Sequence, residues 1–423
     1  MKLPKIVKVV RTYEDNSIQD IESHVEKVLK DAGIQNRVKP GQKIALTMGS
    51  RGINRIDRIL RTVGKVLKEL KAEPYIVLGM GSHGGGTVEG QLKVAEKFGV
   101  TEESMGMPIK ATMEVVRIGT TPNKGIPVFI DKYAAEADGI LMVHRIKFHR
   151  HIMGPHQSGF LKMFAIGLGK KTGAATVHSF GWEQFPENVF EVASLCIQKL
   201  PIVLALGIVE NSFSKTAIIE AVEPNQIIVK NAELLQKSLS MIPRIPFKKI
   251  DVLVVQEIGK NVPPDTNILG KPTLRCYTER HDPDPTRMVV LDLHPSSLGN
   301  AVGVGSFDYI TDRFFKKIDY GITTINAIAA SLPEAAVTPP PLPTDLLAVE
   351  AAVQTSGYPD VEGVANPDDA RIVFLKHTGK MQVLYISACL VDQIDDKATN
   401  HVVGEPFEIP FDKDGNLCLD FSA

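Results

Sequence analysis

The sequence predicts an α/β protein of two domains built on mainly parallel sheets. Its 423 residues exceed the usual size of a single hydrophobic core. Short apolar runs alternate with segments of helical periodicity, which is typical of parallel sheets covered by helices. Hydrophobic residues make up 43% of the chain and charged residues 23%, as in ordinary globular proteins.

The expected elements follow from these periodicities. Apolar residues at helical spacing predict one helix over residues 56–70, and a second helix is expected over about 87–97. Runs of aliphatic and β-branched residues predict the strands between the helices. These strands are residues 43–47, 75–79, 139–143, 202–206, 250–255, 288–291, 371–375 and 383–386.

A basic stretch with two prolines, residues 243–249, marks the expected domain boundary. We expect an N-terminal cofactor-binding domain over 1–246 and a C-terminal domain over 247–423 that closes on the substrate. The last ~20 residues could pack back on the first domain. A second proline run, 339–343, is interpreted as a loop inside the C-terminal domain. We expect the active site in the cleft between the domains, where ligand sites are common.

Charge and composition exclude several classes of protein. A net charge of −1 supplies no basic face for nucleic acid. The basic N-terminus is interrupted by Pro4 and lacks the apolar region of a signal peptide. No window is long and apolar enough to predict a membrane span. The four cysteines are isolated, which predicts reduced thiols in a cytoplasmic protein.

Histidines gather around one lysine in the first half of the chain. Five of the eleven histidines fall between residues 144 and 178, on either side of Lys162. Imidazole moves protons near neutral pH and is the commonest ligand of transition metals. Lys162 lies among apolar neighbours, where a desolvated amine is nucleophilic. An exposed lysine and ordinary solvated or core imidazoles are the alternatives for these residues taken singly.

Polar residues follow four of the expected strands. Arg51 follows the first strand, His83 the second, the segment 144–149 the third, and Glu257 with Lys260 the fourth. Ligands bind outside the carboxyl ends of parallel strands, so these side chains are expected to converge. Arg51 suits a carboxylate or phosphate, although a surface ion pair is the alternative. Glu257 and Lys260 could instead pair with each other in solvent.

Two glycine-rich segments could hold a phosphate through backbone N–H groups. The loop 81–87 contains Gly84 and Gly85 and leads into a helix, where an anion is favoured. A structural turn with Thr87 as helix cap is the alternative. Ser158 and Gly159 form part of the second segment, just before the clustered lysine.

On these motifs the chain resembles the nickel-dependent lactate racemase family and its 2-hydroxyacid racemase and epimerase homologues. The most specific feature is the spacing of sixteen residues between Lys162 and His178. The other matching stretches are Thr47–Ile53, Met80–Gly85, Lys147–His149, Ser158–Met163, Glu257–Lys260 and Ile318–Ala327.

The resemblance implies a nickel pincer nucleotide as cofactor. Lys162 would be its covalent attachment and His178 the protein ligand of nickel, which favours square-planar sites with imidazole. Gly84, Gly85, Ser158 and Gly159 would contact the cofactor, with its single phosphate held by the glycine loops and nearby lysines.

Two histidines would then serve as acid and base on the two faces of the substrate. The resemblance assigns His83 to one face and His149 to the other, with His151 and His156 as alternatives. This second histidine lies thirteen residues before Lys162, a longer spacing than the shortest in the family. Arg51 and Lys260 would bind the substrate carboxylate. Glu257 stands where lactate racemases have glutamine and would suit a substrate with additional hydroxyls, and not lactate itself.

The residues leave two further classes open. A zinc-dependent hydrolase could use His149, His151 and His178, although the usual ligand spacings are absent. A non-catalytic protein that binds a nucleotide cofactor is the other alternative. If the resemblance holds, the partners are a small 2-hydroxy acid and the enzymes that make the cofactor.

Overall fold

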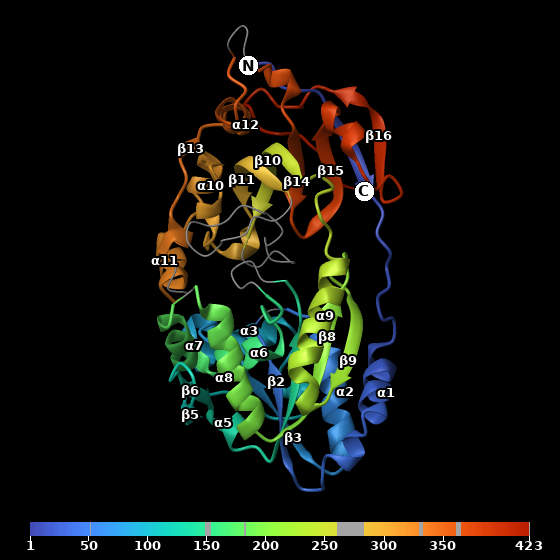
Figure 1. The fold of residues 1–423 in the computed structure, drawn as a ribbon, viewed down its shortest axis with the longest axis vertical. Coiled ribbons are helices and arrows are strands. Elements are labelled where there is room, and N and C mark those ends of the chain that lie inside the picture. The colour runs from blue at the N-terminus through green and yellow to red at the C-terminus, as the bar shows by residue number, and fades with distance from the viewer. Residues whose placement is uncertain are drawn as a thin grey trace. The chain divides into compact units, whose positions relative to one another are not determined.

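The computed structural model describes residues 1–50, 52–148, 154–181, 183–259, 283–329, 333–360 and 365–422. The chain divides into two compact units (Figure 1). The first, here the N-terminal unit, is Asp15–Ile242. The second, the C-terminal unit, combines Met1–Glu14 with Pro243–Ala423.

The N-terminal unit is built on a sheet whose described strands run in the order β4-β3-β2-β7-β8-β9. All neighbours are parallel except β8 and β9. After β2 the chain adds strands on one side of the sheet, and after β7 it adds them on the other side. The boundary between β2 and β7 is therefore a topological switch point. The strands are β2 (Lys43–Met48), β3 (Glu73–Leu78), β4 (Ile109–Lys110), β7 (Gly139–Arg145), β8 (Ile202–Glu210) and β9 (Thr216–Val222), with a separate hairpin of β5 (Val115–Thr120) and β6 (Pro127–Asp131).

Alternating side chains of this sheet enter two separate cores, as the pleat of a strand requires. In β2, Leu46 packs with the apolar stripe of α2, while Ala45 packs with the segment around Phe160 on the other face. Helices thus cover both faces, as a buried parallel sheet needs. They are α1 (Ile21–Asp31), α2 (Ile56–Glu69), α3 (Val88–Lys97), α4 (Glu102–Met105), α5 (Lys132–Ala135), α6 (Phe160–Lys162), a π-helix (Met163–Leu168), α7 (Lys170–Ser179), α8 (Phe185–Lys199) and α9 (Ile227–Met241).

The C-terminal unit has a mixed sheet whose described strands run in the order β13-β12-β11-β10-β14-β15-β1-β16. The half from β13 to β14 is parallel and the half from β14 to β16 is antiparallel. The strands are β1 (Ile6–Arg11), β10 (Lys249–Ile258), β11 (Asp284–Leu293), β12 (Tyr309–Thr311), β13 (Pro341–Leu342), β14 (Ile372–His377), β15 (Lys380–Ser387) and β16 (Asn400–Phe407).

The two chain ends both contribute to the C-terminal unit. β1 pairs with β15 and β16, so it fills a position inside this sheet. Near the other end, Leu417, Leu419 and Phe421 are buried in the core that contains Ile6 and Val252. The helices of this unit are α10 (Asp312–Phe315), α11 (Tyr320–Ala329) and α12 (Asp345–Thr355). Short 3₁₀ turns across both units are Ile34–Asn36, Gly84–Gly86, Pro224–Gln226, Pro295–Ser297, Val304–Ser306, Pro333–Ala336, Pro367–Asp369 and Ala388–Gln393.

The fold confirms the expected α/β class with mainly parallel sheets. Each strand and helix expected from the periodicities is present, with ends shifted by a few residues. The sequence did not predict the antiparallel strands β1, β9 and β16. In the described parts of the chain, no helix has the length and apolar character needed to cross a membrane.

Candidate functional site

The candidate site begins at the switch point between β2 and β7 of the N-terminal unit. Gly49 follows the end of β2, and His144 lies at the end of β7. The two are in contact, because a Cβ built at Gly49 would lie 2.9 Å from Cε1 of His144. Glycine is therefore needed here for the imidazole to reach across the strand ends. Crevices at such switch points are the usual ligand sites of open parallel sheets.

His144 is held in its neutral form. Burial lowers its pKa to about 3, and the charges of Arg145, Lys162 and Lys147 act in the same direction. Its Nδ1 atom is buried and has no hydrogen-bond partner among the described residues. Neutral imidazoles of this kind bind metals or donate and accept single hydrogen bonds.

Lys162 lies at the end of α6, directly before the π-helix. π-Helical turns are rare and are frequent at functional sites. Met163, the next residue, packs on the strand ends, since a Cβ at Gly79 would lie 2.5 Å from its Sδ. The charge of Lys162 contributes to the lowered pKa values of both His144 and His178. Its charge therefore acts on both imidazoles.

His178 lies in the last turn of α7 and stacks on Phe185. Their ring centroids are 4.7 Å apart with an interplanar angle of 19°. Burial lowers the pKa of His178 to about 4, and the charge of Lys162 adds to the effect. The charge of the predicted attachment lysine thus acts on the predicted nickel ligand.

The loop that carries His83 docks on the π-helix. The N–H of Gly81 donates to the carbonyl of Gly167 at 3.0 Å. His83 Nδ1 lies 3.0 Å from the carbonyl of Met80. A carbonyl can only accept, so Nδ1 carries the proton and the neutral ring has its lone pair on Nε2. That is the tautomer a general base requires.

A buried lysine ties this loop to the segment after the π-helix. Lys170 has no exposed side-chain surface, and its ammonium lies 3.1 Å from the equally buried carboxylate of Asp131. It also donates to the carbonyl of Leu78 at 2.6 Å and to Oε1 of Gln91 at 3.0 Å. The amide nitrogen of Gln91 in turn donates to the carbonyls of Gly81 and His83. The network therefore holds the loop at Leu78, which precedes it, and at Gly81 and His83 within it.

Three of the predicted cofactor contacts have evident structural roles. The hydroxyl of Ser158 accepts from the N–H of Lys147 at 2.9 Å and donates to its carbonyl, which closes the loop 147–158. Gly159 has φ 82° and lies against Asn231, leaving no room for a side chain. Gly84 lies equally close to the backbone of Gly90.

The glycine loop allows a matched pair of substitutions. Gly84 and Gly85 have almost the same φ, 66° and 68°, but a Cβ at Gly84 would collide with α3 while one at Gly85 would meet nothing within 4 Å. We expect Gly85→Ala to cost about 1–2 kcal/mol of unfolding free energy from the left-handed backbone alone. Gly84→Ala should cost about 1–3 kcal/mol more, because the helix must move. Equal losses in denaturant titrations would contradict this packing.

Glu257 lies in the C-terminal unit near the end of β10, where it forms an ion pair with Lys376 at 3.4 Å. His156 stacks on Phe190 with centroids 5.4 Å apart, and burial lowers its pKa. The other predicted site residues, Arg51, His149, His151 and Lys260, lie outside the described residues.

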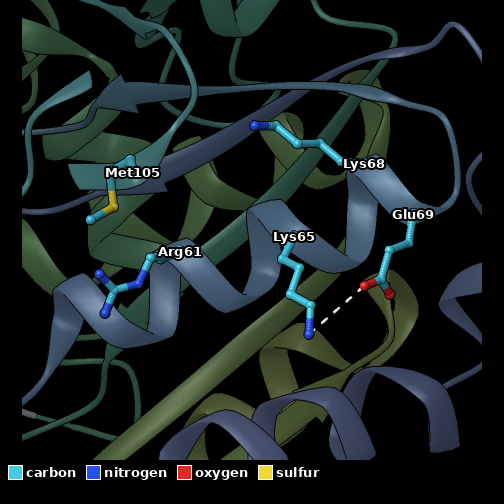
Figure 2. A pocket seen from close by; sticks show the side chains of 5 residues that line it. All are labelled: Arg61, Lys65, Lys68, Glu69 and Met105. Carbon is cyan, nitrogen blue, oxygen red and sulfur yellow. Dashed lines mark ion pairs between the residues drawn. The ribbon is translucent and has the colours of Figure 1, made fainter. Parts of the chain in front are cut away.

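A surface hollow of about 460 Å³ lies elsewhere on the N-terminal unit, along α2 (Figure 2). It is lined by Arg61, Lys65, Lys68, Glu69 and Met105. Its lysines already have partners: Lys65 pairs with Glu26 and Glu69, and Lys68 donates to the carbonyl of Gly106. We assign it no function.

Sequence reasoning named no role for Gln91 or Asp131 and did not single out Lys170, because the sequence gives no sign that these three polar side chains are buried together. His144 was part of the histidine cluster but was not singled out. It directly follows the apolar run 139–143 at the end of a strand next to a switch point, and that position could have identified it.

Comparison with known proteins bears on this unit. Residues 2–184 match the family model of the lactate racemase N-terminal domain. No curated protein matches the chain. Among solved structures, the chain is similar to the lactate racemase apoprotein from Thermoanaerobacterium thermosaccharolyticum, with 14% identity and a TM-score of 0.49, over 88% of this chain and 100% of that one. The resemblance to the lactate racemase family predicted from the sequence motifs is thus found again in residues 2–184, which are similar to the N-terminal domain of that family.

Proposed function

We propose that the protein is a racemase or epimerase of a 2-hydroxy acid that works with a nickel pincer nucleotide held by Lys162 and His178. The observation that carries the proposal is the placement of both residues around the buried π-helix: Lys162 directly precedes it, and the charge of Lys162 acts on the buried imidazole of His178. Both residues lie inside the segment that matches the lactate racemase N-terminal domain. The lactate racemase family is the one that uses this cofactor.

The residues present fit such a cofactor. Lys162 supplies an amine for covalent attachment, and it lies near an imidazole whose burial favours the neutral, metal-binding form. Phe185 stacks on that imidazole and orients its ring. The glycines at 79 and 81 bring the strand ends close to the π-helix that follows the lysine. When bound, the cofactor supplies a hydride acceptor and donor for C2 of the substrate.

The chain contributes the proton transfers. His83 has its lone pair on Nε2 and takes the hydroxyl proton of one enantiomer. Inversion needs a second base on the opposite face, for which we propose His149. An imidazole serves both directions because its two forms are close in free energy near neutral pH.

The remaining assignments concern the substrate. We propose that Arg51 and Lys260 bind its carboxylate, since guanidinium and ammonium groups form charge-assisted hydrogen bonds with that group. Glu257 can accept hydrogen bonds only, which suits a substrate with hydroxyls beyond C2 and disfavours lactate. The described cysteines are free, which supports a reducing compartment such as the cytoplasm.

The test is intact mass and metal content of the protein co-produced with the cofactor-making enzymes. We expect a mass increment of one mononucleotide and about one nickel per chain, both lost in Lys162→Ala. Lys171→Ala is the matched control, because Lys171 lies in the same segment but is exposed. Zinc without an adduct would favour the hydrolase, and neither metal nor adduct would overturn the cofactor assignment.

A further inference from the structure

Three neighbouring parallel strands of the C-terminal unit end in polar residues. β10 carries Glu257 near its end, β14 ends with Lys376 and His377, and His294 directly follows β11. These strands lie in the order β11-β10-β14, so their carboxyl ends form one edge. Two pairs of side chains lie there: Lys376 pairs with Glu257 at 3.4 Å, and the centroids of the two imidazoles are 6.5 Å apart. The charge of Lys376 acts on His377 and so links the two pairs. This is the edge where parallel sheets bind ligands.

Both imidazoles are held in one tautomer. Nδ1 of His294 accepts from the N–H of Ser296 at 3.2 Å, and Nδ1 of His377 accepts from the N–H of Gly379 at 3.1 Å. A nitrogen that accepts from a backbone N–H carries no proton, so each neutral ring has its proton on Nε2. Within the part of the chain that the structure describes, neither Nε2 has a hydrogen-bond partner. The edge therefore presents two N–H donors.

The charge at this edge favours hydroxyl groups over a second anion. The ion pair between Lys376 and Glu257 leaves no net charge there. Burial and the charges of His294, Lys376 and Lys380 lower the pKa of His377 to about 4, so this ring adds no positive charge at neutral pH. A carboxylate gains little from neutral donors next to Glu257. A hydroxyl can accept from an imidazole N–H and donate to that carboxylate.

We propose that the edge formed by Glu257, His294, Lys376 and His377 binds the hydroxyl groups of a polyhydroxylated 2-hydroxy acid. This inference rests on the proposed function and names its substrate class. A site built to hydrogen-bond hydroxyls rejects analogues that lack them, because its polar groups are then left unpaired. Lactate has no hydroxyl beyond C2 and leaves this edge unused.

The experiment is calorimetric binding of gluconate and of lactate to the full-length protein, co-produced with the cofactor-making enzymes. The protein carries His83→Asn to prevent turnover. We expect His377→Phe and His294→Phe each to weaken gluconate binding about tenfold, the loss of roughly one hydrogen bond. Lactate binding should not change with either substitution. His401→Phe is the control, because His401 is an exposed histidine on β16 of the same unit.

The outcomes separate this inference from the proposed function. Unchanged gluconate affinity in both folded histidine variants would overturn the hydroxyl site. Equal weakening of lactate and gluconate would also overturn it, since the edge would then bind the part that the two acids share. If one of the two histidine variants fails to fold, the gluconate affinity of the other tests the proposal. The intact mass of the same samples shows whether Lys162 carries the adduct. Failure of the cofactor assignment is therefore detected separately from failure of the hydroxyl site.

Discussion

Replacing Lys170 with methionine is expected to lower the unfolding free energy of the N-terminal unit by about 3–5 kcal/mol. The substitution keeps the apolar stem but removes the ammonium, so the carboxylate of Asp131 is left fully buried without its partner. Burial already raises the pKa of Asp131 and lowers that of Lys170, which indicates how strongly each charge depends on the other. The carbonyl of Leu78 and the amide of Gln91 lose a donor as well.

Two further variants make the measurement decisive. Adding Asp131→Asn to Lys170→Met should recover much of the loss, because the amide oxygen can still accept from the N–H groups of Tyr133 and Ala134. Lys230→Met is the control, since Lys230 pairs with Glu220 and Glu233 at the surface. It should change stability by no more than about 1 kcal/mol. A similar loss for Lys230 and Lys170 in urea titrations would show that burial of the pair is unimportant.

The backbone of Lys170 reinforces this expectation. It adopts φ 55°, a left-handed conformation that costs a non-glycine residue about 1–2 kcal/mol. Such strain persists only where surrounding contacts over-determine the conformation. The three contacts of the ammonium supply that constraint, and they connect the π-helix segment to the loop of His83.

Local sequence patterns predicted the longer parallel strands, because burial on both faces requires continuous apolar runs. They did not predict the short parallel strands β4, β12 and β13. They did not predict β1, whose partner β15 lies more than 370 residues further along the chain. Pairing over such a distance depends on which edge is open in the folded sheet, and no local pattern records that. β16 was missed because its exposed side chains break the apolar run, and β9 was missed because Glu220 interrupts its apolar run.

Site residues could be predicted from the sequence where they directly follow a predicted strand. His83 was predicted because it follows an expected strand, and Lys162 was predicted because histidines cluster around it. Lys170 was not, because a sequence gives a lysine no sign of burial until its partner Asp131 is placed against it. His294 and His377 were not identified from the sequence for a related reason. Their strands are neighbours of β10 only through the order of the sheet.

His83→Asn is expected to lower kcat by roughly 10²–10⁴-fold while leaving the Lys162 adduct and the nickel content intact. The asparagine amide can still donate to the carbonyl of Met80, as Nδ1 of the imidazole does, so the loop should keep its conformation. What is lost is Nε2, the atom with the lone pair that accepts the substrate proton. His24→Asn is the matched control, because His24 is a half-buried histidine of the same unit whose ring also contacts a carbonyl, that of Ile219 at 3.4 Å.

The turnover rate of the His83 variant must be compared with the amount of cofactor that it carries. If the His83 variant carries a full adduct and still turns over a 2-hydroxy acid at near the unsubstituted rate, His83 is not the base. If the variant loses both adduct and rate, His83 acts on cofactor attachment and not on the substrate. Only a slow, fully loaded enzyme agrees with proton transfer at Nε2, because the lost step then lies after cofactor binding. Measuring each enantiomer separately sharpens the result, since a base on one face should be needed most for the enantiomer whose hydroxyl it deprotonates.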